Sequence, residues 1–252
     1  MNESYPAAEA RSGRGVRARA REQILSEILA LAEAQLREKG AYGLSLRAIA
    51  RELGMVSSAI YRYFSSADAL LTALIVRAYN ELADAAQAQY DAAGSEPRLA
   101  QFLAVCHGSR DWAIANPHRY ALIYGSPVPG YQAPPETIEP AGRVGLLMIA
   151  TATGVQGRGF HHPPSEWPQE RAALTATLTE HFGSALEPDM IAVGVAAWSH
   201  LFGLISFELF GHFVGSVSNN RVYFDAVMRN WAAQLGLSGT QGRELMSSQY
   251  LL

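Results

Sequence analysis

Apolar residues near the start of the chain recur at the spacing of a helix. Leu46, Ile49 and Leu53 lie at i, i+3 and i+7, which places them on one helical face. Gly54 follows directly, and glycine ends helices readily because it enters the left-handed backbone region without a Cβ penalty. The pattern predicts a short helix that stops at a tight turn.

A second short helical pattern follows that turn, from residue 58 to residue 64. Ser57 is a favourable N-cap for it, and Ile60 and Phe64 share its inner face. Its outer face is small or polar and consists of Ser57, Ser58, Ala59, Tyr61, Arg62 and Tyr63. Two helices joined in this way are typical of a helix-turn-helix. An αα-corner in an ordinary helical protein has the same spacing, so the spacing alone leaves both interpretations open.

The outer face of the second helix suits the major groove of DNA. A groove about 12 Å wide admits a short helix whose leading residues are small, as the first three are here. The three that follow can donate hydrogen bonds to phosphate oxygens, which hold a protein in register on the duplex. Ser45 and Arg47, at the start of the first helix, complete the predicted contacts with DNA. Ser45 can also cap that helix, and Ser65 with Asp68 predicts a capping box for the helix that follows the pair.

The same stretch resembles the TetR family of bacterial transcriptional regulators. The resemblance covers roughly residues 21–82 and depends on Ile49-Ala50, Gly54 and the run Tyr61-Arg62-Tyr63-Phe64. It implies a three-helix DNA-binding head, a larger helical ligand domain and a homodimer that binds a double-stranded DNA operator. Family members usually carry a lysine that contacts phosphate where this chain has Ala67, so one backbone contact is missing.

The helical patterns predict an all-α protein. It has an N-terminal three-helix helix-turn-helix head and a larger C-terminal helical domain for ligand binding and dimerisation. The expected segments are a disordered basic arm (1–20), the DNA-binding domain (21–65), a connecting helix (66–93), the ligand-binding and dimerisation domain (94–238) and a tail (239–252).

Charge is distributed unevenly along the chain. The net charge of −3 by itself argues against a nucleic-acid binder. Residues 1–62, however, contain 10 of the 20 basic residues and 7 of the 23 acidic ones, so this part carries +3 and the remainder −6. A basic head on an acidic body is expected when one end of a protein meets phosphate.

Residues 11–21 contain five arginines and no acidic residue. Such an arm can lie on backbone phosphates or in a minor groove, with Arg17 and Arg19 as candidate contacts. A solvated tail that aids solubility explains the same composition equally well.

Residues 125–142 contain five prolines, which prevents a regular helix and predicts a long loop. A long loop inside a compact domain is often functional, so a lid or rim of a ligand pocket is one interpretation. A plain surface connection is the other.

Residues 190–207 form a run of 18 residues without formal charge, which is the lower limit for a membrane span. Ser199 and His200 interrupt the run, and no cluster of positive charge flanks it. We therefore expect no membrane span but a helix buried on most sides. An amphipathic helix follows at residues 220–237, and the resemblance places these last two helices in the dimer interface. The run from Trp198 to Gly203 also resembles a Trp…Gly signature of one TetR subgroup, with Phe202 where that subgroup has histidine.

The sequence contains no fingerprint of a catalytic, metal or cofactor site. Gly-x-Ser-x-Gly, phosphate-loop and His-Glu-x-x-His patterns are absent. Cys106 is the single cysteine and lies in an apolar run. We therefore predict no enzyme, no metal and no cofactor. Candidate residues for an apolar ligand pocket are His107, Trp112, Tyr120, Tyr124, Trp198, Ser199 and Phe202, although residues of these kinds are more often simply part of a core.

These observations predict a cytoplasmic repressor that an unidentified small-molecule effector releases from a palindromic operator. The alternative is a helical protein that binds small molecules or partners and has lost specific DNA reading.

Overall fold

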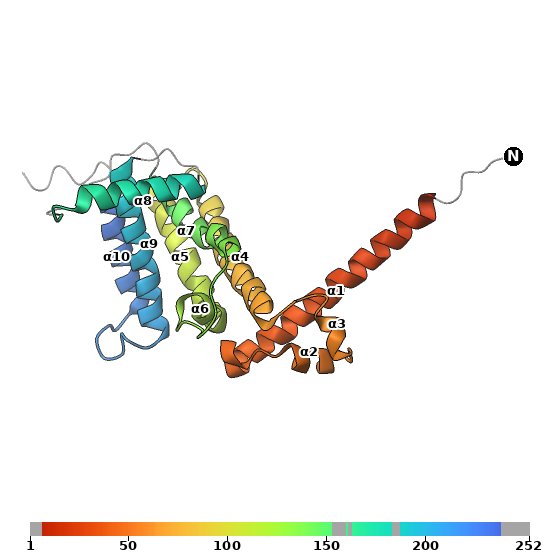
Figure 1. Cartoon of the computed structure of the whole chain (residues 1–252). Helices are drawn as coiled ribbons and strands as arrows, with labels where there is room; N and C mark the ends of the chain where they lie inside the picture. The colour runs from red at the N-terminus through yellow and green to blue at the C-terminus, as the bar shows by residue number, and fades with distance from the viewer. Residues whose placement is uncertain (1–6, 153–159, 161–162, 183–186, 238–252) are drawn as a thin grey trace, which may run out of the picture. The chain divides into compact units, whose positions relative to one another are not determined.

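Every regular element of the protein is a helix within residues 7–152, 160, 163–182 and 187–237, which the computed structural model describes (Figure 1). The all-α prediction is therefore confirmed. The chain divides into two compact units, which we call the head (Met1–Ile75 with Ser126–Ala133) and the body (Val76–Gly125 with Pro134–Leu252).

The head is a small helical unit around one apolar core. Its elements are α1 (Ala7–Lys39), the 3₁₀ turn η1 (Ala41–Gly43), α2 (Leu46–Glu52), α3 (Ser57–Ile60) and the first part of α4 (Ala67–Ala93). Each helix contributes fully or almost fully buried residues to the core, among them Ile28, Ala32, Ile49, Ile60, Leu70 and Leu74.

Gly54 closes α2 with a left-handed residue, as the sequence predicts. Its φ is +64°, a backbone conformation that L side chains rarely adopt. The N–H of Met55 donates to the carbonyl of Ala50 at 2.8 Å, and the N–H of Gly54 donates to that of Arg51 at 3.1 Å. This pair of bonds is a Schellman motif, which ends a helix and fixes the direction of the chain that leaves it.

Three local predictions in the head were wrong. Residues 7–20 are not a disordered arm but the first part of α1, because alanine, arginine and glutamate favour helix even without an apolar stripe. The N-cap of α3 is Val56 rather than Ser57. At the start of α4 it is Ser66, not Ser65, whose hydroxyl oxygen accepts from the N–H of Ala69 at 3.0 Å.

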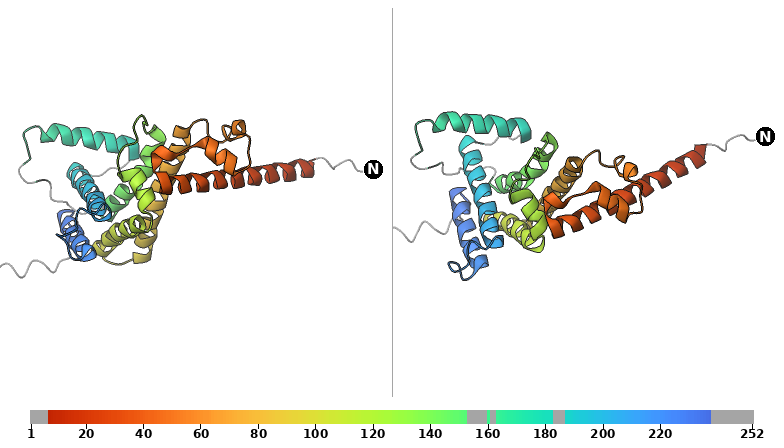
Figure 2. Two further views of the ribbon diagram at one scale, coloured as in Figure 1. Left: turned by 90° about the horizontal axis from the view of Figure 1, so that it is seen from below. Right: turned by 60° about the horizontal axis from the view of Figure 1, so that its bottom comes forward.

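The body consists of helices packed around α9. Its elements are the remainder of α4, α5 (Arg98–Ala115), α6 (Pro117–Tyr124), the 3₁₀ turn η2 (Pro135–Thr137), α7 (Ile138–Thr151), α8 (Trp167–Phe182), α9 (Pro188–Leu209) and α10 (Asn220–Gln234). Helices α5, α6, α7, α8 and α10 all contact α9, and α10 runs beside it in each view (Figure 2). Helix α7 begins earlier than predicted, because Pro140 lies in its first turn, where proline is tolerated.

Helix α9 is long and apolar enough to cross a membrane by length and composition alone, but 56% of its most apolar 18-residue window is buried within the chain. The burial supports its interpretation as a core helix. The predicted tail, residues 239–252, lies outside the described residues.

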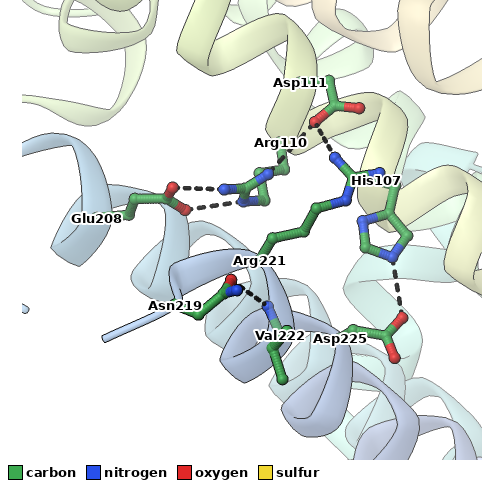
Figure 3. Close-up of polar contacts among 8 residues, drawn as sticks. All are labelled: His107, Arg110, Asp111, Glu208, Asn219, Arg221, Val222 and Asp225. Atoms are coloured by element: carbon green, nitrogen blue, oxygen red, sulfur yellow. Dashed lines mark hydrogen bonds and ion pairs between the residues drawn. The ribbon is translucent and has the colours of Figure 1, made fainter. Parts of the chain in front are cut away.

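A polar network ties α5 to α9 and α10 at one end of the body (Figure 3). Arg110 binds Glu208 with two hydrogen bonds, Nε to Oε2 at 2.8 Å and Nη2 to Oε1 at 2.5 Å. Both side chains are largely buried, so each depends on the other for charge compensation. Asp111 also pairs with Arg221 of α10, with 3.3 Å between Oδ1 and Nη1.

Candidate nucleic-acid interface

The outer surface of α3 and of the turn that follows it is polar and exposed. Ser57, Ser58, Tyr61 and Arg62 are all exposed, while Ile60 is fully buried beneath them. The head core thus fixes the inner side of α3 and leaves hydroxyl and guanidinium groups on the outer side. These are the groups that donate to phosphate oxygens and base edges.

Ala59 does not lie on this outer surface, and its predicted placement there was wrong. Only 7% of its surface is exposed. Helix α3 is a single turn, Ser57–Ile60, and within that turn Ala59 faces inward beside Ile60. Of the three small residues predicted to face the DNA at the start of α3, only the two serines are exposed.

Tyr63 is half-buried at the edge of this surface, with Arg21 of α1 beside it. The guanidinium carbon of Arg21 lies 5.3 Å from the centroid of the Tyr63 ring. A cation at this distance is attracted to the face of the ring. The contact holds a second positive charge next to the helix-turn-helix. No local pattern in the sequence points to this contact, because only the fold brings α1 to Tyr63.

The first turn of α2 forms another part of the candidate surface. The Ser45 hydroxyl oxygen accepts from the N–H of Ala48 at 3.3 Å, so Ser45 caps α2 as predicted. Its own N–H donates to Gln35 Oε1 of α1 at 2.9 Å, which fixes α2 against α1. Arg47 is exposed in the first turn of α2.

The predicted arm contacts lie on α1. Arg19 is exposed there, and the side chain of Arg17 lies outside the described residues. Ala67, where family members usually carry lysine, is exposed as the first residue of α4. The missing lysine would therefore have projected from an exposed helix start.

The proline-rich loop Ser126–Ala133 belongs to the head, although it lies in sequence between α6 and α7 of the body. We call this segment the strap. The hydroxyl groups of Tyr131 in the strap and Thr72 of α4 lie 2.9 Å apart, and Thr72 is only 5% exposed. The Tyr42 hydroxyl donates a longer bond, 3.4 Å, to the Pro127 carbonyl. Side chains of η1 and α4 thus hold the strap against the helical part of the head.

The strap owes its shape to a tight turn. The N–H of Tyr131 donates to the carbonyl of Val128 at 3.1 Å, and Gly130 between them has φ +81°. Proline followed by a glycine with positive φ is the arrangement of a type II turn. Proline also restricts the backbone, so the strap forms a stiff connection.

Four of the seven predicted pocket residues come together in the body. Tyr120 and Tyr124 of α6 and Trp198 and Phe202 of α9 form one aromatic cluster. The rings of Tyr124 and Phe202 are stacked, with centroids 4.1 Å apart and an interplanar angle of 15°. Trp198 meets Phe202 edge-on at 5.9 Å. Burial raises the pKa of the Tyr124 hydroxyl, as does the proximity of Tyr79 and Tyr120, so this group stays a neutral donor.

The other three predicted pocket residues make contacts away from the stacked rings. His107 lies in the polar network, with its Nε2 3.0 Å from Asp225 Oδ1 (Figure 3). Ser199 is exposed, and its hydroxyl donates to the Ala196 carbonyl at 2.9 Å. Trp112 is half-buried against the body core.

Comparisons with known proteins decide the family. A family model described as "Bacterial regulatory proteins, tetR family" matches residues 28–74, and "Tetracyclin repressor-like, C-terminal domain" matches residues 102–231. The HTH-type transcriptional regulator Rv1816 of Mycobacterium tuberculosis H37Rv is 41% identical over 224 residues, which is 88% of this chain and 96% of that protein. The chain belongs to the TetR family.

Solved structures agree with this assignment. The crystal structure of SCO4313 matches with a TM-score of 0.68 and 32% identity, over 86% of this chain and 98% of that one. A protein of unknown function from Rhodococcus sp. RHA1 shares the fold, with a TM-score of 0.61 and 23% identity over 86% of this chain and 96% of that one. The protein is thus a TetR-type DNA-binding transcriptional regulator, and its helix-turn-helix is α2–α3 of the head.

We expect Tyr131→Phe to loosen the strap, because it removes a hydrogen bond to a largely buried hydroxyl, worth about 1 kcal/mol. Hydrogen exchange of backbone amides in the strap should accelerate about fivefold. Tyr42→Phe is the matched control, since its bond is longer and Tyr42 is 70% exposed. An equal or larger acceleration in Tyr42→Phe would contradict the assignment.

Proposed function

We propose that the protein is a cytoplasmic, homodimeric repressor that grips a near-palindromic operator with two heads and leaves it when a small molecule binds the body. The observation that carries the proposal is the exposed polar surface of α3, above a core that fixes its orientation. Two heads about 34–36 Å apart, one turn of DNA, would enter successive major grooves.

Within the proposed interface the residues divide by chemistry. Ser57 and Ser58 begin α3, where small hydroxyl residues can approach base edges. Tyr61, Arg62 and Arg47 would bind phosphates, which would set affinity without reading sequence. Arg21, beside Tyr63, adds charge next to the same surface.

Substitution of Arg62 by Ala should weaken binding to every DNA sequence, because the side chain neutralises phosphate. Fluorescence anisotropy with DNA from upstream of the protein's own coding sequence should show a salt slope shallower by about 1 per head. Ser58→Ala should instead change the preferred bases and keep the slope. Arg171→Ala, on α8 of the body, is the control. An unchanged slope in Arg62→Ala would argue against a phosphate contact.

An apolar face on α9 and α10 supports a homodimer. Phe207 near the end of α9 is 49% exposed, and Phe210 just after it is 45% exposed. On α10, Val222 is 65% and Tyr223 43% exposed. The rings of Phe207 and Tyr223 both contact Phe213, each with 5.5 Å between centroids. Large apolar residues gathered on a surface mark a site for another protein. A second copy is the partner that the family resemblance implies.

Gly203, in the middle of α9, strengthens this interpretation. A Cβ atom built on Gly203 meets no atom within 4 Å. A glycine inside a helix costs about 1 kcal/mol relative to alanine, and nothing within the described residues requires it. The absence of a side chain at Gly203 would allow a helix of a second copy to approach α9 closely, which would explain the glycine.

Gly203→Arg should therefore convert the dimer to a monomer, because the long side chain would occupy the space of the partner helix. Sedimentation velocity measures the assembly, and circular dichroism checks that the helices remain. Ala88→Arg, at an exposed position of α4, should leave the assembly unchanged. A Gly203→Arg protein that stays dimeric would place the interface elsewhere.

Release by a small molecule requires that ligand binding in the body alters the heads. The chain passes between body and head at three places, once within α4 and once at each end of the strap. A ligand that moves α6 would act on the strap, since only Gly125 separates the end of α6 from Ser126. The ligand can shift DNA affinity only as far as it binds one state better than the other.

A further inference from the structure

Two buried donors in the aromatic cluster of the body have no hydrogen-bond partner. They are the Tyr124 hydroxyl and the Trp198 indole N–H, and neither is paired within the described residues. Nearly all buried donors in proteins are paired, because an unpaired one loses its bonds to water and gains nothing in return. Two unpaired donors in one cluster therefore point to a partner that comes from outside the chain.

The side chains that carry the two donors both contact Phe202. Tyr124 stacks on one face of the Phe202 ring, and Trp198 meets that ring edge-on. The neighbouring hydroxyls are already engaged. Tyr120 donates to the Phe202 carbonyl at 2.8 Å, and Tyr79 donates to the Ile123 carbonyl at 3.4 Å. The available polar chemistry of the cluster is thus one O–H and one N–H beside aromatic rings.

The cluster lies partly at the surface of the body. Tyr124 and Trp198 are half-buried side chains, so part of each ring meets solvent although its polar atom does not. The Trp198 ring lies over Gly145 of α7, where a Cβ would come within 3.3 Å of Trp198 Cδ1. The absence of a side chain at Gly145 thus leaves room for the indole between α7 and α9.

We propose that this cluster binds an uncharged, planar aromatic carbonyl compound, whose oxygen accepts from Tyr124 Oη and Trp198 Nε1. A flat ring suits the aromatic surfaces. Both donors are neutral, since burial raises the pKa of the Tyr124 hydroxyl and an indole N–H donates without charge. A carboxylate would enter with a charge that neither donor compensates. The proposal rests on the proposed function, because it names the class of effector that would release DNA.

The test uses a matched pair of probes with one skeleton, 9-fluorenone and fluorene, together with fluorene-9-carboxylate as the charged analogue. Equilibrium dialysis against the full chain measures each affinity. We expect fluorenone to bind more tightly than either analogue. Tyr124→Phe should weaken fluorenone binding by about 2- to 10-fold, which is the effect of one neutral hydrogen bond, and leave fluorene binding unchanged. Trp198→Phe also removes ring surface, so it should weaken the binding of both probes, and that of fluorenone more.

Thermal unfolding without any probe separates binding from folding. Tyr124→Phe removes an unpaired hydroxyl, so its Tm should equal or exceed that of the parent, whereas a purely structural hydroxyl would lower the Tm when removed. Equal affinity for fluorenone and fluorene, no binding of either, or unaltered fluorenone affinity in both variants would overturn the proposal.

Binding of the upstream DNA in the absence of probes is measured on the same preparations. Intact DNA binding with no preference for the ketone would refute this site alone. Absence of DNA binding would refute the proposed function instead, while a preference for the ketone that depends on Tyr124 and Trp198 would still support the site.

Discussion

The left-handed turn at Gly54 is the constraint on which the recognition surface depends. It ends α2 and sends the chain into α3 at a fixed angle. Ile60 and Ala59 can then enter the head core, and the two serines and Arg62 remain outside. A single turn of helix has little stability of its own, so α3 owes its orientation to this turn and to the core beneath it.

Two segments of different kinds connect the head to the body. One is continuous helix, since α4 runs from the head into the body without interruption. The other is the strap, a stiff proline-rich segment that is held to the head by Tyr131 and Thr72. The strap follows directly after α6, which carries both tyrosines of the aromatic cluster. The proposed ligand in the body would have a physical route to the head through these two connections.

Local signals in the sequence predicted the local features of the fold. Ser45 as a cap, Gly54 as a helix end and Ile60 as a core residue follow from backbone chemistry and spacing within a few residues. The inward position of Ala59 did not follow, because a four-residue helix is too short for periodicity to fix its faces. The contacts of Arg21 with Tyr63, Arg110 with Glu208 and Tyr131 with Thr72 join residues far apart in sequence. Such pairings depend on tertiary packing, and no local pattern encodes them.

Affinity for the upstream DNA, compared between Gly54→Ala and Gly54→Asn, tests the role of this turn most directly. Alanine is strained at φ +64°, whereas asparagine tolerates the left-handed region. If the turn orients α3, the alanine variant should lose about fivefold in affinity, equivalent to roughly 1 kcal/mol of strain, and the asparagine variant should lose much less. Equal affinity of the two variants and the parent would contradict the claim that this turn sets the recognition surface.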